Sequence, residues 1–206
     1  MTLPANRRAR DLRLSVAHHI GNTLSVTTPS QVAGGAPVVL TVPIYHDWPL
    51  GDPDSMRDPS GAQQPAWVGT TWIQDGAGMR SYSILQVDVY TRIGAPGNPA
   101  GDGFGLANAD VCDAFVAAFA GIKPSGALAA YVPILDFDVP TAPVVPPAGE
   151  GGCLVLQTPQ GQFGVPSERR SLGRKNGFVR TVMRLHFRTI EDAIRGAGTA
   201  YYAPQA

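Results

Sequence analysis

The chain has 206 residues and a formal net charge of zero at pH 7; 44% of its residues are hydrophobic and only 16% are charged. This length and hydrophobic content suit one large or two small globular domains with a sizeable core. No run of about 18 apolar residues occurs, so we expect neither a transmembrane helix nor a membrane partner.

The start of the chain, residues 4–20, predicts a helix that ends at Gly21. Its apolar residues recur at three- and four-residue steps and therefore share one face: Ala9, Leu12, Val16 and Ile20. The short apolar run 38–42 predicts a strand. Residues 46–66 are rich in proline, and we interpret them as a long inserted loop.

Two longer strands are predicted next, over residues 67–74 and 82–90. In the second strand, Leu85, Val87 and Val89 alternate with mostly polar residues, so one face is apolar. A turn signal, Asp75-Gly76, follows the first strand. We therefore expect the two strands to form a hairpin.

The second half of the chain begins with a predicted helix over residues 106–120, which follows a loop rich in glycine and proline. Residues 129–139 predict a strand. Residues 140–176 are interpreted as a second long insertion, interrupted by a short strand at 153–158. Near its end lies a predicted basic loop with four positive side chains: Arg169, Arg170, Arg174 and Lys175.

The last predicted strand, residues 178–188, has one apolar and one basic row. The row expected to face the core consists of Val179, Thr181, Met183, Leu185 and Phe187. The opposite row consists of Arg180, Arg184, His186 and Arg188. Arginines are costly to bury alone, so this row must meet water, nucleic acid or carboxylates. Candidate carboxylates on a neighbouring copy are Asp75, Asp88, Asp110 and Asp113.

The order of elements predicts one α+β domain over residues 1–206, with a mostly antiparallel sheet, two helices packed on one face, and inserted loops at about 46–66 and 140–176. Charge is segregated along it: residues 21–164 hold four Lys or Arg and twelve Asp or Glu, whereas residues 165–206 hold eight and three. Such segments can face each other within one fold or join neighbouring copies.

The sequence predicts no catalytic, metal or cofactor site. The glycine-rich stretch 101–105 departs from the dinucleotide fingerprint, because Leu106 stands where the third glycine is required. His18 and His19 are adjacent on the predicted helix and point about 100° apart, so they cannot share one ion. Cys112 and Cys153 lack an activating motif, and we expect both to be reduced.

One strand–loop–helix unit resembles a known family. The segment Ile84-Leu85-Gln86-Val87-Asp88-Val89-Tyr90, a glycine-rich gap, and then Ala107-Asn108-Ala109-Asp110-Val111-Cys112-Asp113-Ala114-Phe115 resemble the tail-terminator proteins of long-tailed bacteriophages. The family pattern also has a leading helix and a late closing strand, which residues 5–20 and 178–188 can supply. The resemblance covers about half of the chain, and the two long insertions depart from it.

The resemblance implies a structural virion protein, not an enzyme, that uses no cofactor. Such a protein forms a hexameric ring at the head-proximal end of the tail, stops polymerisation of the tail tube and meets a head-completion or connector protein. DNA passes through the ring without specific binding. The chain would be assembled in the host cytoplasm. Its expected interface residues are Arg169, Arg170, Arg174, Lys175, Arg180, Arg184, Arg188, Asp75 and Asp88.

Three alternatives remain open. The chain could be another neck or baseplate protein of a phage-like particle. It could be a small hydrolase with a site around Asp136, Asp138 and His186. It could also be a nucleic-acid-binding module that uses the basic C-terminal third; binding through phosphates would weaken steeply as salt rises.

Overall fold

The computed structural model describes residues 5–29, 35–47, 64–74, 82–93, 106–119, 131–137, 152–160, 162, 164–175 and 177–191. Within these residues the elements in chain order are α1 (Ala5–Ile20), β1 (Thr23–Thr28), β2 (Val38–His46), β3 (Ala66–Gln74), β4 (Tyr82–Arg92), α2 (Leu106–Ala117), β5 (Tyr131–Pro133), β6 (Gly152–Leu156), β7 (Glu168–Lys175) and β8 (Phe178–Glu191).

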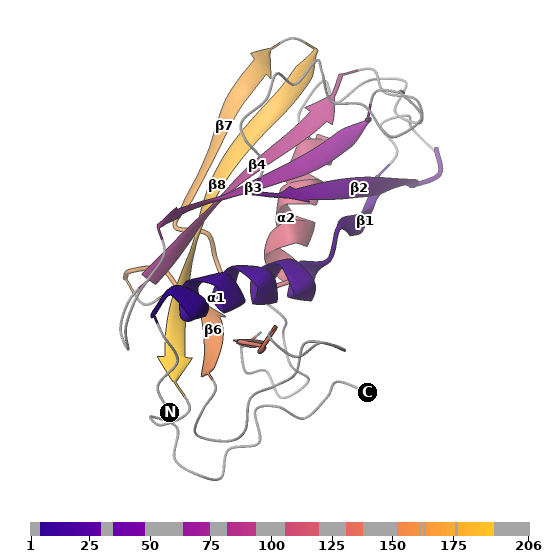
Figure 1. Ribbon diagram of the computed structural model, residues 1–206. Helices are drawn as coiled ribbons and strands as arrows, with labels where there is room; N and C mark the ends of the chain where they lie inside the picture. The colour runs from indigo at the N-terminus through magenta and orange to yellow at the C-terminus, as the bar shows by residue number, and fades with distance from the viewer. Residues whose placement is uncertain are drawn as a thin grey trace.

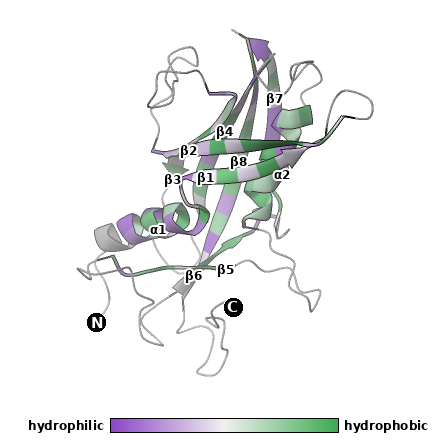
Figure 2. Ribbon diagram, turned by 90° about the vertical axis from the view of Figure 1, so that its right-hand side faces the viewer, coloured by the Kyte–Doolittle hydropathy of each residue, from purple (hydrophilic) through white to green (hydrophobic). Residues whose placement is uncertain are grey.

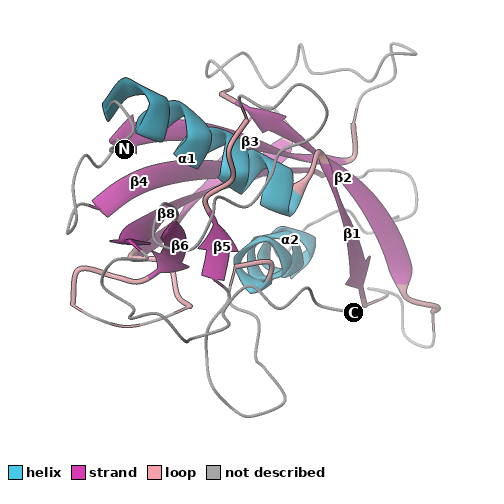
Figure 3. Cartoon of the chain, turned by 60° about the horizontal axis from the view of Figure 1, so that its bottom comes forward, coloured by secondary structure: helices cyan, strands magenta, loops and turns pink. Residues whose placement is uncertain are grey.

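The predicted fold class is confirmed: the chain is an α+β protein whose curled, mostly antiparallel sheet carries both described helices on one side (Figures 1 and 3). The strands follow the order β1-β2-β3-β4-β8-β6-β5, and β7 also pairs with β8. Among the described pairs, only β2 and β3 are parallel. The predicted hairpin is present as β3 and β4.

The larger of two core clusters lies between the helices and one face of the sheet. α1 contributes Leu12, Val16 and Ile20, and the α2 region contributes Val111, Phe115 and Phe119. All five residues predicted to face the core from the last strand are buried: Val179, Thr181, Met183, Leu185 and Phe187. Hydrophobic and hydrophilic residues accordingly alternate along β8 (Figure 2). Each large apolar side chain buried in this way contributes about 1.5–3 kcal/mol.

The strand β2 is longer than predicted and runs through Pro43. Residues 38–43 pair with β1, and residues 44–46 pair with β3 instead. Proline lacks a backbone N–H, so it interrupts a strand least where the strand changes partner. The predicted strand over 38–42 is therefore too short, since it ends just before Pro43. Of the predicted strand over 129–139, the structure describes residues 131–137, and in these the strand is confined to β5.

Two strands were missed, and both lie at margins of the sheet. The predicted basic loop around Arg169 is wrong, because residues 168–175 form β7 and pair with β8. All eight residues of β7 are exposed, so it has no apolar row to reveal it. The strand β1 was missed because it is short and only two of its six residues, Leu24 and Val26, are apolar. Residues 48–63 of the first predicted insertion and residues 140–151, 161, 163 and 176 of the second lie outside the described residues.

Candidate functional site

The basic side chains of β7 divide between the two faces of the sheet. Arg169 stands opposite the buried Met183 and therefore points to the helix side. There its guanidinium forms an ion pair with Asp113 and donates to the backbone oxygen of Ala109, both on α2. Arg170 stands opposite Val182, in the row that faces away from the helices. The edge strand is thus attached to α2 through one arginine and presents the next one outward.

Arg180 and Asp88 form a largely buried ion pair on the outer face of the sheet. The Arg180 guanidinium donates to Asp88 Oδ1 at 3.0 and 2.6 Å, and the Asp88 side chain is only 3% exposed. Gln86 donates to the other carboxylate oxygen at 2.9 Å. Asp88 was proposed to contact a neighbouring copy. The structure gives its carboxylate partners within its own chain.

Of the other members of the basic row, Arg184 is exposed, and His186 and Arg188 are partly buried like Arg180. Arg184 pairs with Glu168 of β7 at 3.1 Å, and both side chains are about half exposed. Arg188 donates to Gln157 Oε1 at 3.4 Å. Burial lowers the pKa of His186 below its ordinary value, and the neighbouring Arg184 acts in the same direction. As predicted, the whole row lies on the face away from the helices. Asp75, the remaining predicted interface residue, lies outside the described residues.

An aromatic cluster lies beside this row. Trp67 stacks on Tyr90 with ring centroids 4.8 Å apart, and Phe178 meets Trp67 edge-on at the same separation. The guanidinium of Arg92 lies 4.7 Å above the Phe178 ring, and that of Arg180 lies 5.5 Å from the Tyr90 ring. Burial raises the pKa of Tyr90, and Asp88 adds to that rise. These contacts hold Arg180 and Arg92 against the aromatic cluster across β3, β4 and β8.

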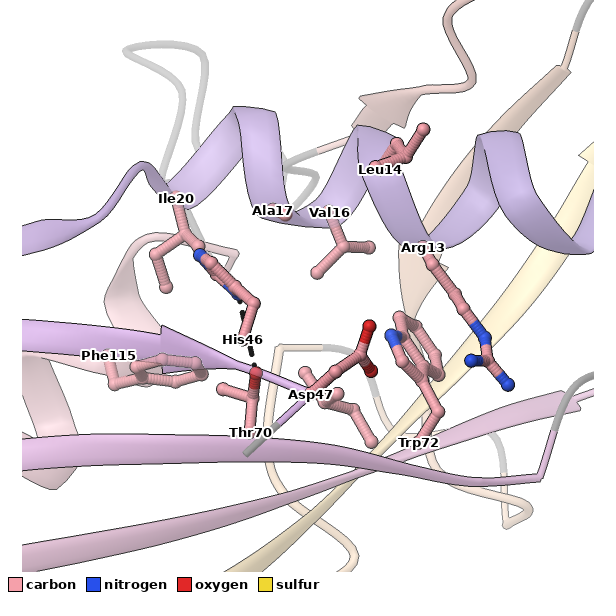
Figure 4. Close-up of a pocket in the computed structure, with 11 residues that line it drawn as sticks. Arg13, Leu14, Val16, Ala17, Ile20, His46, Asp47, Thr70, Trp72 and Phe115 are labelled. Atoms are coloured by element: carbon pink, nitrogen blue, oxygen red, sulfur yellow. Dashed lines mark hydrogen bonds between the residues drawn. The ribbon is translucent and has the colours of Figure 1, made fainter. Parts of the chain in front are cut away.

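A small cavity of about 70 Å³ lies between α1 and strands β2 and β3 (Figure 4). His46 lies at this cavity with one ring nitrogen, Nε2, 2.9 Å from the backbone oxygen of Gly21 and the other 3.3 Å from Thr70 Oγ1. The carbonyl can only accept, so Nε2 carries the hydrogen. The volume is far below the roughly 300–1,000 Å³ of small-molecule sites. His46 therefore joins the end of α1 to the sheet.

Neither cysteine has the surroundings of a reactive thiol. Cys112 and Cys153 are both buried. Burial raises the pKa of Cys112 to about 11, so its thiol stays protonated at neutral pH. Among the residues that the structure describes, no three His, Cys, Asp or Glu side chains could together hold a metal ion. No described helix is long and apolar enough to cross a membrane.

The residues of the hydrolase alternative lie on different elements. His186 is on the outer face of β8, and Asp136 follows β5. Asp138 lies outside the described residues. Comparison with models of known protein families finds no match, and no curated protein is similar to this chain.

Proposed function

We propose that this chain is a structural protein of a long-tailed bacteriophage that forms a hexameric ring, caps the tail tube and joins it to the head connector. One observation carries the proposal: the two segments that resemble tail terminators pack together as a unit. The strand segment lies in β4, at the centre of the sheet, and the helix segment lies in α2.

A buried side chain links these two segments. Asn108 of α2 donates from Nδ2 to the backbone oxygens of Val89 on β4 and Val179 on β8, each at 3.2 Å. A buried amide in hydrogen-bond contact with two strands fixes the height and rotation of a helix over a sheet. The late strand that the family pattern requires, β8, therefore belongs to the same unit as the strand and helix that carry the resemblance.

The margin of the sheet supports the assembly role. A ring needs a contact in which two different surfaces of the same chain meet. The fully exposed strand β7 supplies one such surface, with four basic side chains among its eight residues. In the proposed ring the remaining partners are the tail tube protein on one side and a head-completion or connector protein on the other. The DNA passes through the centre without specific binding.

Depletion of this chain from a particle-producing culture tests the proposal. We expect tail tubes of irregular length that carry no heads, as seen by negative-stain electron microscopy, and restoration of normal particles when the chain is supplied again. Normal tails joined to heads in its absence would contradict the proposal. Heads joined to tails but with a defective tail tip would favour the baseplate alternative.

A nucleic-acid-binding module is the second candidate, because β7 and β8 bring several basic side chains together. Binding through phosphates predicts an affinity for duplex DNA that falls steeply as salt rises. We expect weak binding without sequence preference. Tight binding at physiological salt that is lost in an Arg170→Glu, Lys175→Glu double variant would favour this second function.

A further inference from the structure

The strand β7 has one edge that no other described strand pairs with. Within the described part of the chain it pairs only with β8, and all eight of its residues are exposed (Figure 1). The strand β6 pairs with a later part of β8, residues 187–191, and so does not cover β7. An open strand edge presents unpaired N–H and C=O groups that another strand can bind.

The charge of β7 argues against pairing with itself. The strand holds four basic residues and one acidic residue, Glu168. In an antiparallel pair of two β7 strands centred between Ser171 and Leu172, Arg169 of each copy faces Arg174 of the other, which destabilises the pair, although Glu168 then faces Lys175. A symmetric contact between two β7 strands is therefore disfavoured. The partner must be a strand of a different kind.

The opposite margin of the sheet provides such a strand. β1 forms one end of the strand order and pairs only with β2 among the described strands. Its sequence, TLSVTT, has no charge, and its outward residues Thr23, Ser25 and Thr27 are exposed. β-Branched residues such as threonine and valine favour strand pairing. The remaining margin, β5, has only three residues and ends in Pro133, so it is a poor partner.

We infer that β7 of one copy pairs with β1 of the next copy, so that the sheet continues from subunit to subunit. This inference rests on the proposed ring and names its contact. The two margins differ, so the contact is of the head-to-tail kind that closes into a ring when its rotation allows. The irregularity between Ser171 and Arg174, where Gly173 has a φ of +74°, confines regular pairing to the first half of β7.

Cysteine pairs can test this contact directly. Ser25 alternates with the buried Val26, and Arg170 stands opposite Val182, so both face away from the helices. Facing residues on paired strands have Cβ atoms about 4.5–5.5 Å apart, close enough for oxidation or a short cross-linker. Thr23→Cys, Ser25→Cys and Thr27→Cys, each combined with Arg170→Cys, sample the possible registers. The natural cysteines are buried and serve as background.

We expect at least one of the three double variants to give a ladder of covalent oligomers on a denaturing gel, while every single variant stays monomeric. Covalent dimers from Arg170→Cys alone would overturn the inference, because they require a symmetric contact.

Native mass spectrometry separates failure of the inference from failure of the proposed function. If it shows a ring while all three double variants stay monomeric on the gel, the inference fails and the proposed function stands. If native mass spectrometry shows no ring, both fail. If the Arg170→Glu variant still forms intact rings and loses only DNA binding, β7 would instead be a nucleic-acid-binding strand.

Discussion

Asp88 shows how one residue can belong both to a family-like motif and to the stability of the sheet. It lies in the segment that resembles tail terminators, and its carboxylate is 3% exposed. A buried carboxylate needs hydrogen bonds and an opposite charge, which Gln86 and Arg180 provide. Removal of Arg180 would leave that charge without its counter-ion.

We therefore expect Arg180→Met to lower the free energy of unfolding by about 2 kcal/mol, a value reduced from that of fully buried pairs because Arg180 is one-third exposed. The matched control is Arg184→Met on the same strand. Its pair with Glu168 is about half exposed on both sides, so the loss should be below about 1 kcal/mol. Equal losses in urea denaturation would show that the Asp88 pair is not specially important.

His186 gives the protein a pH dependence of known sign. Burial, aided by Arg184, lowers its pKa in the folded chain below the ordinary value of 6.5. As the pH falls, the unfolded chain therefore binds a proton at His186 before the folded chain does. The free energy of unfolding decreases as the pH falls from about 6.5 to the lowered pKa of the folded chain. We expect His186→Gln to weaken this decrease, measured by urea denaturation at about pH 7 and about pH 5.5. An unchanged pH dependence would contradict the prediction.

At the scale of elements, Ser15 joins α1 to the segment after β5. Its hydroxyl is buried, accepts a hydrogen bond from the Leu135 N–H at 2.8 Å and donates to the Asp11 backbone oxygen at 2.6 Å. The nearby Ile134 packs against the core. Ser15 therefore fixes the segment after β5, at one margin of the sheet, to α1.

Ser15→Ala should lower the free energy of unfolding by about 2 kcal/mol, because it leaves the buried N–H of Leu135 without its acceptor. Ser25→Ala, at an exposed position of β1, is the matched control and should change stability by less than about 0.5 kcal/mol. Thermal or urea unfolding of the two variants measures the difference. A similar loss in both would mean that the hydrogen bond to Leu135 contributes little.

Most of the central elements were predictable because they carry a strong period. β4 and β8 alternate apolar and polar residues and α1 places its apolar residues on one face, whereas α2 is apolar on most sides and has little periodicity. The margins were not predictable in the same way. β7 is exposed on both faces, so its sequence ERRSLGRK reads as a polar loop, and only its pairing with β8 makes it a strand.

The candidate interface was predicted only in part. The sequence placed Arg180, Arg184, His186 and Arg188 on one outward face, and the structure confirms this. Alternation along a strand is enough for that result. It could not show that Asp88 would pair with Arg180 of the same chain, because cross-strand register depends on the whole sheet.

At the scale of the molecule, the chain packs its helices on one side of a curled sheet, with a basic row on the other face and, among the described strands, β1, β5 and β7 at the margins (Figures 1 and 2). Positive charge is concentrated late in the chain, on the paired strands β7 and β8. A subunit of this kind can add neighbours at its edges without disturbing its core. The proposed ring uses that property.

Electron cryomicroscopy of intact particles tests the proposed ring most directly. We predict six copies of the chain in one ring between the tail tube and the head connector, with this fold fitting the density of each copy. The same reconstruction would show which strands meet between copies. A particle that lacks the chain at this position, or that holds it only as separate monomers, would contradict the proposed function.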